Sequence, residues 1–128
     1  MALVVKNQLG NVLTFKQDVS YVNAAQIKHE LLTFLDTCSL ECLWLDMGQV
    51  KFIDSIGIGI IATVYSTAKQ QNRRIVLCRI NPPVQLVLEL TGLDQVLEFS
   101  DTVPDFSGTG FDNLNAQEGT FSLSAKAG

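Results

Sequence analysis

Asp54 and Ser55 are the residues of this sequence best suited to chemistry, and they open the stretch Asp54-Ser55-Ile56-Gly57-Ile58-Gly59. A serine at the start of a helix can cap free backbone N–H groups, and those groups, with the positive end of the helix dipole, can also hold a phosphate. The sequence therefore leaves two roles open for Ser55, a helix cap and an acceptor of a phosphoryl group from another protein. Phosphorylation would add about −1.5 to −2 charges beside Asp54, which a helix start tolerates and a docked partner does not.

Nucleotide binding, serine hydrolysis and metal binding each need further residues at set spacings, and this sequence lacks them. The stretch 57–62 matches G-x-G-x-x-A, but it does not directly follow a strand and no acid stands about 20 residues later, which disfavours a nucleotide cofactor. Residue 53 is Ile, so no hydrolase elbow is formed, and the single histidine, His29, is expected on the outer face of a helix. Cys38 and Cys42 match no metal-ligand spacing. We expect no enzymatic activity, no cofactor and no metal.

Composition limits the class of protein. A chain of 128 residues that is 47% hydrophobic has the length for one domain with its own core. A net charge of −4 disfavours nucleic acid as a partner. The longest apolar run, 56–65, is half the length of about 20 residues that a membrane helix needs, and no secretory signal precedes it. Three cysteines, an odd and sparse set, are typical of a protein whose thiols stay reduced, so we expect a cytoplasmic protein. The short apolar run gives no reason to expect a membrane partner.

Periodicity predicts the elements that position Ser55. Asn23, Asn81 and Gly92 supply helix start and stop signals, and Gly10-Asn11 suits the turn of an opening hairpin. The pattern predicts strands at 3–9, 12–16, 43–47, 50–53 and 75–78, helices at 23–36, 56–71 and 81–92, and weak strand or helix material at 96–99 and 102–106. This order predicts an α/β fold with a mixed sheet of about four to five strands and helices packed against it. Ile53 to Ser55 should then lie at the carboxyl end of a strand, where loops gather.

The second predicted helix is apolar on more than one side. Ile58, Ile61 and Tyr65 can face the sheet, which leaves Ile60 and Val64, with Ile56 nearby, for a second stripe. Periodicity does not say what lies opposite a helix. The stripe is therefore either an exposed partner interface or a surface covered by the third helix or the tail.

The composition changes after Phe106. Residues 107–128 contain four glycines and three serines, which predicts a flexible C-terminal tail beyond a domain at 1–106. Phe111 and Phe121 are isolated apolar residues in this tail, and they could instead dock on the domain or on a partner.

Three segments together resemble one known family. Phe52-Ile53-Asp54-Ser55-Ile56-Gly57-Ile58-Gly59 resembles the signature of STAS domains, the bacterial anti-sigma factor antagonists. The segment 43–47 looks like the strand before that signature, and 83–93 resembles the third helix and its closing Thr-Gly-Leu. The resemblance covers about residues 3–106.

The resemblance implies a partner switch. The unphosphorylated protein would bind an anti-sigma factor that is also a serine kinase, phosphorylation of Ser55 would break the complex, and a metal-dependent serine phosphatase would restore it. Gly57 and Gly59 would permit close backbone approach. With the second stripe included, the expected partner-binding residues are Asp54, Ser55, Ile56, Gly57, Ile60 and Val64.

Two features depart from the family pattern. Ile56 stands where many members have serine or threonine, and the segment 20–24 looks more like the STAS domain attached to sulfate-permease transporters. Two alternatives to sigma-factor control remain open. One is a STAS-type module that senses a small ligand or nucleotide through the glycine-rich junction, and the other is a partner-switching scaffold in a circuit without a sigma factor.

Overall fold

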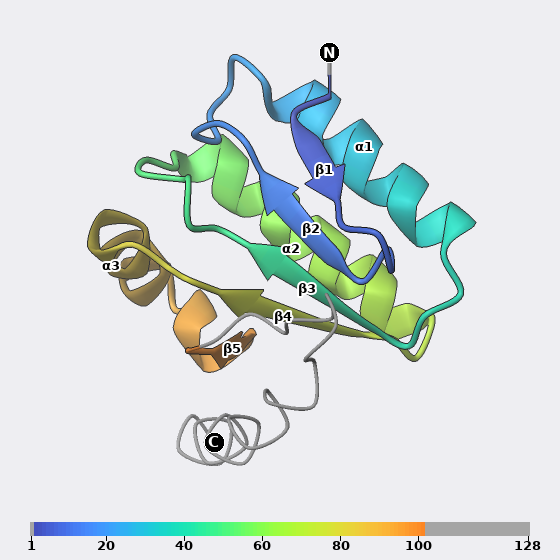
Figure 1. The fold of residues 1–128 in the computed structure, drawn as a ribbon. Helices are drawn as coiled ribbons and strands as arrows, with labels where there is room; N and C mark the ends of the chain where they lie inside the picture. The colour runs from blue at the N-terminus through green and yellow to red at the C-terminus, as the bar shows by residue number, and fades with distance from the viewer. Residues whose placement is uncertain (1, 102–128) are drawn as a thin grey trace.

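The computed structural model describes residues 2–101, which form a five-stranded sheet and three α-helices (Figure 1). This confirms the predicted α/β fold. The elements in chain order are β1 (Val4–Lys6), β2 (Val12–Phe15), α1 (Ala24–Thr37), β3 (Cys42–Asp46), α2 (Ser55–Gln70), β4 (Arg74–Cys78), α3 (Pro82–Thr91), the short 3-10 helix η1 (Leu93–Gln95) and β5 (Glu98–Ser100).

The strands lie in the sheet in chain order, from β1 at one edge to β5 at the other. β1 and β2 form the predicted antiparallel hairpin, in which Gly10 adopts a positive φ of 76°. Every later pair is parallel, so each connection must cross back through a helix. The carboxyl ends of β2, β3 and β4 therefore share one edge, and the loop that leads into α2 starts there.

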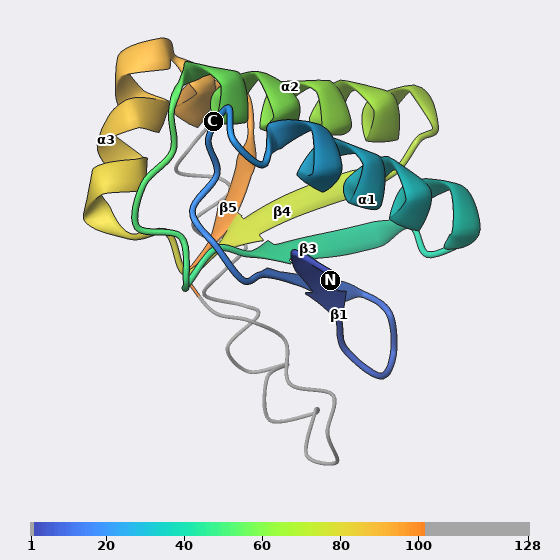
Figure 2. The same cartoon turned by 90° about the horizontal axis from the view of Figure 1, so that it is seen from above.

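The core fills the space between the sheet and the helices, and α1 and α2 lie side by side on one face of the sheet (Figure 2). Side chains alternate along each strand, so every second strand residue points into this core. It includes Leu13, Phe15, Leu43, Leu45, Ile75 and Leu77 from the strands, Ile27 and Leu31 from α1, and Ile58 and Ile61 from α2.

The second apolar side of α2 is covered rather than exposed. Ile60 and Val64 are 6% and 1% exposed, so the expectation that they form a partner surface is wrong. Because α2 packs against both the sheet and α1, it needs a wider apolar arc than a helix with one neighbour. Ile56, in the first turn, remains 52% exposed.

Helix boundaries follow the predicted signals, but two caps act differently. Gly92 ends α3 in the left-handed conformation at φ 79°. Asn23 and Asn81 occupy the N-cap positions of α1 and α3 without capping them through their side chains. The Asn81 side-chain amide instead donates to the carbonyls of Gly48 and Val50, at 3.1 and 2.8 Å. Both asparagines thus tie loops together, since Asn23 donates to a loop carbonyl in the same way.

The segment 50–53, predicted as a strand, makes only a single parallel bridge, between Ile53 and Val19. Its N–H groups at Lys51 and Phe52 are bound by the Asp18 side chain, so they do not form a ladder. The segment 96–99, predicted as weak strand or helix, overlaps β5, which spans Glu98–Ser100. The stretch 102–106 and the predicted tail 107–128 lie outside the described residues.

An ion pair between a buried carboxylate and a half-exposed arginine fixes the carboxyl edge of the sheet. Asp46, at the end of β3, is 5% exposed and accepts two hydrogen bonds of 2.8 Å from the Arg79 guanidinium. The Thr14 hydroxyl on β2 also donates to it, at 3.2 Å. Burial by itself raises the pKa of the Asp46 carboxyl, but hydrogen bonds from Arg79 and the Gly48 N–H outweigh it, and the pKa lies below its usual value. The pair therefore joins β2, β3 and the segment after β4.

We predict that Asp46→Asn lowers the free energy of unfolding by about 1–3 kcal/mol at pH 7, because the amide cannot satisfy the guanidinium. A carboxyl with a lowered folded pKa stabilises the fold above its unfolded pKa of about 3.9, and this stabilisation is lost as pH falls through the folded value. Urea unfolding at pH 7 and at pH 3 should therefore show the difference from wild type shrinking in acid. Glu41→Gln, at an exposed site, is the control. A difference that stays constant with pH would contradict the ion-pair explanation.

Candidate functional site

Ser55 is the first residue of α2 and is exposed, and Asp54 before it is the helix cap. Asp54 has the extended backbone of a cap, with φ −102° and ψ −176°, and its Oδ1 accepts from the Gly57 N–H at 2.8 Å. The capping role considered for Ser55 therefore belongs to Asp54. The Ser55 hydroxyl is left at the surface, beside the N–H groups of the first helical turn.

The second oxygen of Asp54 binds another loop. Its Oδ2 accepts from the Tyr21 N–H at 2.9 Å. The pKa of the Asp54 carboxyl lies below its usual value, first because the Gly57 N–H donates to it and then because Tyr21 does, with partial desolvation acting against them. The carboxylate is thus a permanent negative charge next to Ser55 at neutral pH.

Residues 18–22 and 51–55 form one unit, which we call the two-loop platform. The Asp18 Oδ1 accepts from the N–H groups of Lys51 and Phe52, at 2.7 and 3.2 Å. The Val19 N–H donates to the Phe52 carbonyl at 3.1 Å, and the Asp54 N–H donates to the Val19 carbonyl at 3.2 Å. Together these hydrogen bonds fix the backbone that leads into Ser55.

Sequence reasoning missed Asp18 and Tyr21 as parts of this site. The one available signal was the preference of aspartate side chains for loop N–H groups. That preference does not name a partner 33 residues away, so only the fold could join Asp18 to Lys51.

The two glycines of the signature differ in their surroundings. A Cβ on Gly57 would lie 2.7 Å from Ile53 Cγ1, 2.8 Å from Val19 Cγ1 and 2.9 Å from the Val19 carbonyl oxygen. A Cβ on Gly59 would meet nothing within 4 Å. Close packing within the fold therefore requires glycine at 57, whereas Gly59 faces open space, so close approach of a partner at Gly59 stays a prediction.

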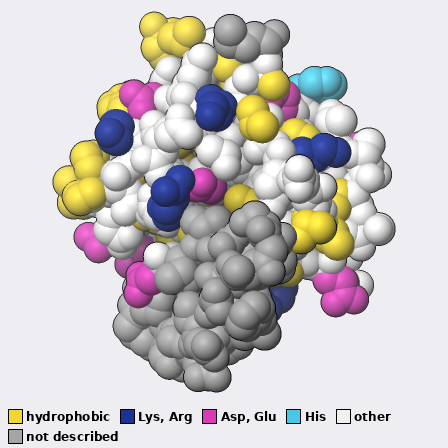
Figure 3. Space-filling model, in the orientation of Figure 1, with side chains coloured by type: hydrophobic (Ala, Val, Ile, Leu, Met, Phe, Trp, Pro, Cys, Tyr) yellow, Lys and Arg dark blue, Asp and Glu magenta, His cyan; other side chains and the backbone are white. Residues whose placement is uncertain are grey.

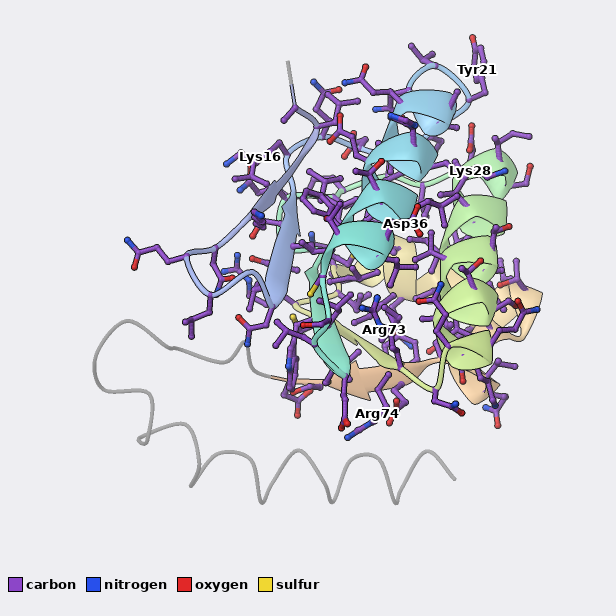
Figure 4. The ribbon with its side chains drawn as sticks, turned by 90° about the vertical axis from the view of Figure 1, so that its right-hand side faces the viewer. Lys16, Tyr21, Lys28, Asp36, Arg73 and Arg74 are labelled. Carbon is purple, nitrogen blue, oxygen red and sulfur yellow. The ribbon has the colours of Figure 1, made fainter. Side chains whose placement is uncertain are left out.

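Large apolar side chains are exposed on the two segments of the platform and at the start of α2. Tyr21 and Val22 are each 76% exposed, and Phe52 is 54% exposed. With Ile56 they line the two-loop platform and the first turn of α2. We call these four residues the apolar rim. Figure 4 shows Tyr21 at the end of the molecule away from Arg73 and Arg74.

Other sites considered from the sequence do not assemble. His29 is exposed as predicted. Residues 2–101 contain no group of three His, Cys, Asp or Glu side chains able to hold a metal. Cys78 is buried, which raises the pKa of its thiol to about 12. None of the helices in the described part of the chain has the length and apolar character needed to cross a bilayer.

The glycine pair gives a matched test of the site's packing. Gly57→Ala should destabilise the protein by about 1–3 kcal/mol, because the added methyl meets the backbone of Val19. Gly59→Ala should stabilise it by about 0.5–1 kcal/mol, because an exposed helical glycine gains helix propensity without a clash. Thermal unfolding of both variants checks the opposite signs. A destabilising Gly59→Ala would show that the helix start is packed differently.

Curated proteins with similar sequences are named as anti-sigma factor antagonists. The chain is 31% identical to the anti-sigma F factor antagonist of Paenibacillus polymyxa over 61 residues, which are 48% of this chain and 52% of that protein. It is 31% identical to the putative anti-sigma factor antagonist BtrV of Bordetella bronchiseptica over 74 residues, 58% of this chain and 63% of that one. The matches thus span from about half to under two thirds of these relatives.

Solved structures share the fold at low identity. A putative anti-sigma factor antagonist from Thermotoga maritima superposes with a TM-score of 0.69 at 21% identity, over 91% of this chain and 92% of that one. The anti-sigma factor antagonist SpoIIAA in its unphosphorylated form gives 0.57 at 14%, over 81% and 87%. The murine anion transporter Slc26a9 gives 0.58 at 22%, over 62% of this chain and 13% of the transporter.

A family match covers the whole described fold. Residues 2–106 match the family model of the STAS domain. The match includes the sheet, the helices and the junction at Ser55, in agreement with the resemblance found in the sequence. The chain therefore belongs to the STAS domain family.

Proposed function

We propose that this protein is an anti-sigma factor antagonist whose binding is switched by phosphorylation of Ser55. Unphosphorylated, it binds an anti-sigma factor that is also a serine kinase, and so it frees a sigma factor. The names of its relatives support the class of partner. The observation that carries the switch is the exposed Ser55 hydroxyl at the first position of α2, set among the apolar rim.

The helix start suits a phosphate on Ser55. First-turn N–H groups and the positive end of the helix dipole favour an anion there. No acidic side chain lies in the first turn of α2, and Lys69 stands in its last turn. A phosphorylated chain should therefore keep its fold, so that the modification acts on association rather than on stability.

The apolar rim is the proposed docking surface for the kinase. Exposed aromatic and branched side chains grouped around a reactive residue are typical of an interface centre. Asp54 adds a fixed negative charge, and Gly57 lets the start of α2 lie against Val19 so that Ser55 and Ile56 point outward. Ile60 and Val64 are not part of this surface because they are buried in the core.

Phosphorylation would break the complex through charge. The kinase transfers the terminal phosphoryl group of ATP to Ser55 Oγ, ADP leaves, and the hydroxyl proton passes to a base of the kinase. The new dianion then lies next to the Asp54 carboxylate and among apolar side chains that a bound partner would desolvate. A metal-dependent serine phosphatase restores the binding form. This cycle needs ATP and a sigma factor, so we assign the protein to the cytoplasm.

The switch is tested with Ser55→Ala and Ser55→Glu against an anti-sigma kinase recovered from native cells on immobilised Ser55→Ala protein. With ATP, the wild-type chain should gain one phosphate on Ser55 and dissociate, whereas Ser55→Ala stays bound. Ser55→Glu should bind at least about tenfold more weakly, a difference of about 1.4 kcal/mol. Ser66→Glu, an exposed serine on the far half of α2, should bind normally. Equal affinities for the two Ser55 variants, or phosphate on another residue, would reject the mechanism.

The docking surface is tested by truncating its side chains. Phe52→Ala and Ile56→Ala should each weaken kinase binding by about tenfold, since buried interface anchors commonly contribute more than 1 kcal/mol. Leu9→Ala is the control, because Leu9 is 55% exposed in the β1–β2 turn, at the end of β2 opposite the one that leads into the two-loop platform. Isothermal titration with the unphosphorylated chain measures the effect. Normal binding by both rim variants would place the interface elsewhere.

A further inference from the structure

Asp18, in the loop between β2 and α1, holds the backbone of the segment that leads into Ser55. Its Oδ1 accepts from the Lys51 N–H at 2.7 Å and from the Phe52 N–H at 3.2 Å. Within residues 2–101, the segment 50–53 makes a single strand-like bridge, so a sheet ladder does not hold it. The carboxylate therefore supplies the acceptor that a neighbouring strand would otherwise supply to these two N–H groups.

Asn23 in turn fixes the position of Asp18. The Asn23 side-chain amide donates to the Asp18 carbonyl at 2.7 Å, and its Oδ1 accepts from the Ser20 N–H at 3.1 Å. Asn23 occupies the N-cap position of α1, and α1 packs against α2. The backbone of Asp18 is thus tied to the helix layer, and its carboxylate binds the other loop from a fixed place.

The Phe52 side chain depends on its backbone for its direction. The ring is 54% exposed, so core packing does not hold it. Its backbone is bound on both sides, because the N–H donates to Asp18 and the carbonyl accepts from the Val19 N–H at 3.1 Å. Figure 3, drawn in the orientation of Figure 1, shows hydrophobic side chains at the surface over the two loops at the upper left, with charged side chains beside them.

We propose that Asp18 is a positioning residue for partner binding, which presents Phe52 to the kinase by holding the N–H groups of Lys51 and Phe52. The inference rests on the proposed function, because it takes the apolar rim as the docking surface. Without this acceptor the two N–H groups would bind water, and the loop would occupy several conformations that the complex must then restrict. A loop that is ordered before binding loses less conformational entropy in the complex, so the Asp18 contact raises the affinity.

The first test compares Asp18→Ala with Asp18→Asn in isothermal titration against the anti-sigma kinase recovered on immobilised Ser55→Ala protein. Asp18→Ala should bind about three- to tenfold more weakly, because the loop must be ordered in the complex. Asp18→Asn keeps an oxygen at the place of Oδ1, so it should restore the affinity. An asparagine variant as weak as the alanine variant would show that the partner reads the charge of Asp18 directly, which would overturn the positioning role.

The second test is a double-mutant cycle between Asp18→Ala and Phe52→Ala. If Asp18 acts through Phe52, the double variant should bind no more weakly than Phe52→Ala alone, whereas independent effects multiply. Multiplied losses would therefore overturn the inference. Asp36→Ala is the matched control and should bind normally, because it also removes one exposed aspartate, near the end of α1 away from Asn23. Thermal unfolding of each variant shows that it is folded at the temperature of the titration.

The positioning role and the proposed function fail in different ways. Normal binding by Asp18→Ala beside weak binding by Phe52→Ala overturns the positioning role and leaves the proposed function intact. Normal binding by Phe52→Ala overturns the docking surface and the positioning role together. Equal affinities of the two Ser55 variants reject the phosphorylation switch, and the double-mutant cycle still decides whether Asp18 positions Phe52.

Discussion

The Asp54 carboxylate organises the candidate site of this molecule. One of its oxygens accepts from the Gly57 N–H and thereby starts α2, and the other accepts from the Tyr21 N–H and so ties down the loop between β2 and α1. A single ionised group thus fixes the direction of the helix and the position of the neighbouring loop. Because Asp54 carries the cap, Ser55 need not, and its hydroxyl is available at the surface.

The platform around Asp54 is built mainly from backbone groups. Asp18 binds two N–H groups of the facing loop, and Val19 exchanges hydrogen bonds with Phe52 and Asp54. Since these bonds do not depend on large side chains in the loops, the side chains of Tyr21 and Phe52 are free to point outward. Hydrogen bonds thus supply the rigidity of the platform, and the apolar rim is left exposed as the proposed contact surface. The lack of a Cβ at Gly57 is what allows the two layers to approach.

The two faces of the sheet impose different demands on the chain. On one face, α1 and α2 lie side by side, so α2 must be apolar toward both neighbours and buries Ile60 and Val64 as well as Ile61. On the other face, which carries Val12, Trp44 and Val76, no helix of residues 2–101 is packed (Figure 2). The sheet is joined at its carboxyl edge by the Asp46–Arg79 pair, which links three neighbouring parts of the fold without using the helices.

The sequence by itself determined the order of most elements and the junction at which the candidate site lies. Gly10-Asn11 marked the hairpin, Gly92 marked the end of α3, and the signature at 52–59 marked the junction and its family. These are local signals, because a turn or a helix end depends on a few adjacent residues. They also placed Ser55 at the start of α2, within one residue of where the helix begins.

Only the tertiary structure decided which groups meet across the chain. It assigned the cap to Asp54 rather than Ser55, turned the predicted strand at 50–53 into a loop held by Asp18, and buried Ile60 and Val64. It also showed that Gly57, unlike Gly59, is required for close packing. The physical reason is the same each time. Burial and hydrogen-bond partners depend on residues that are distant in the sequence, and a periodic pattern shows which face of an element is apolar without showing what lies against it.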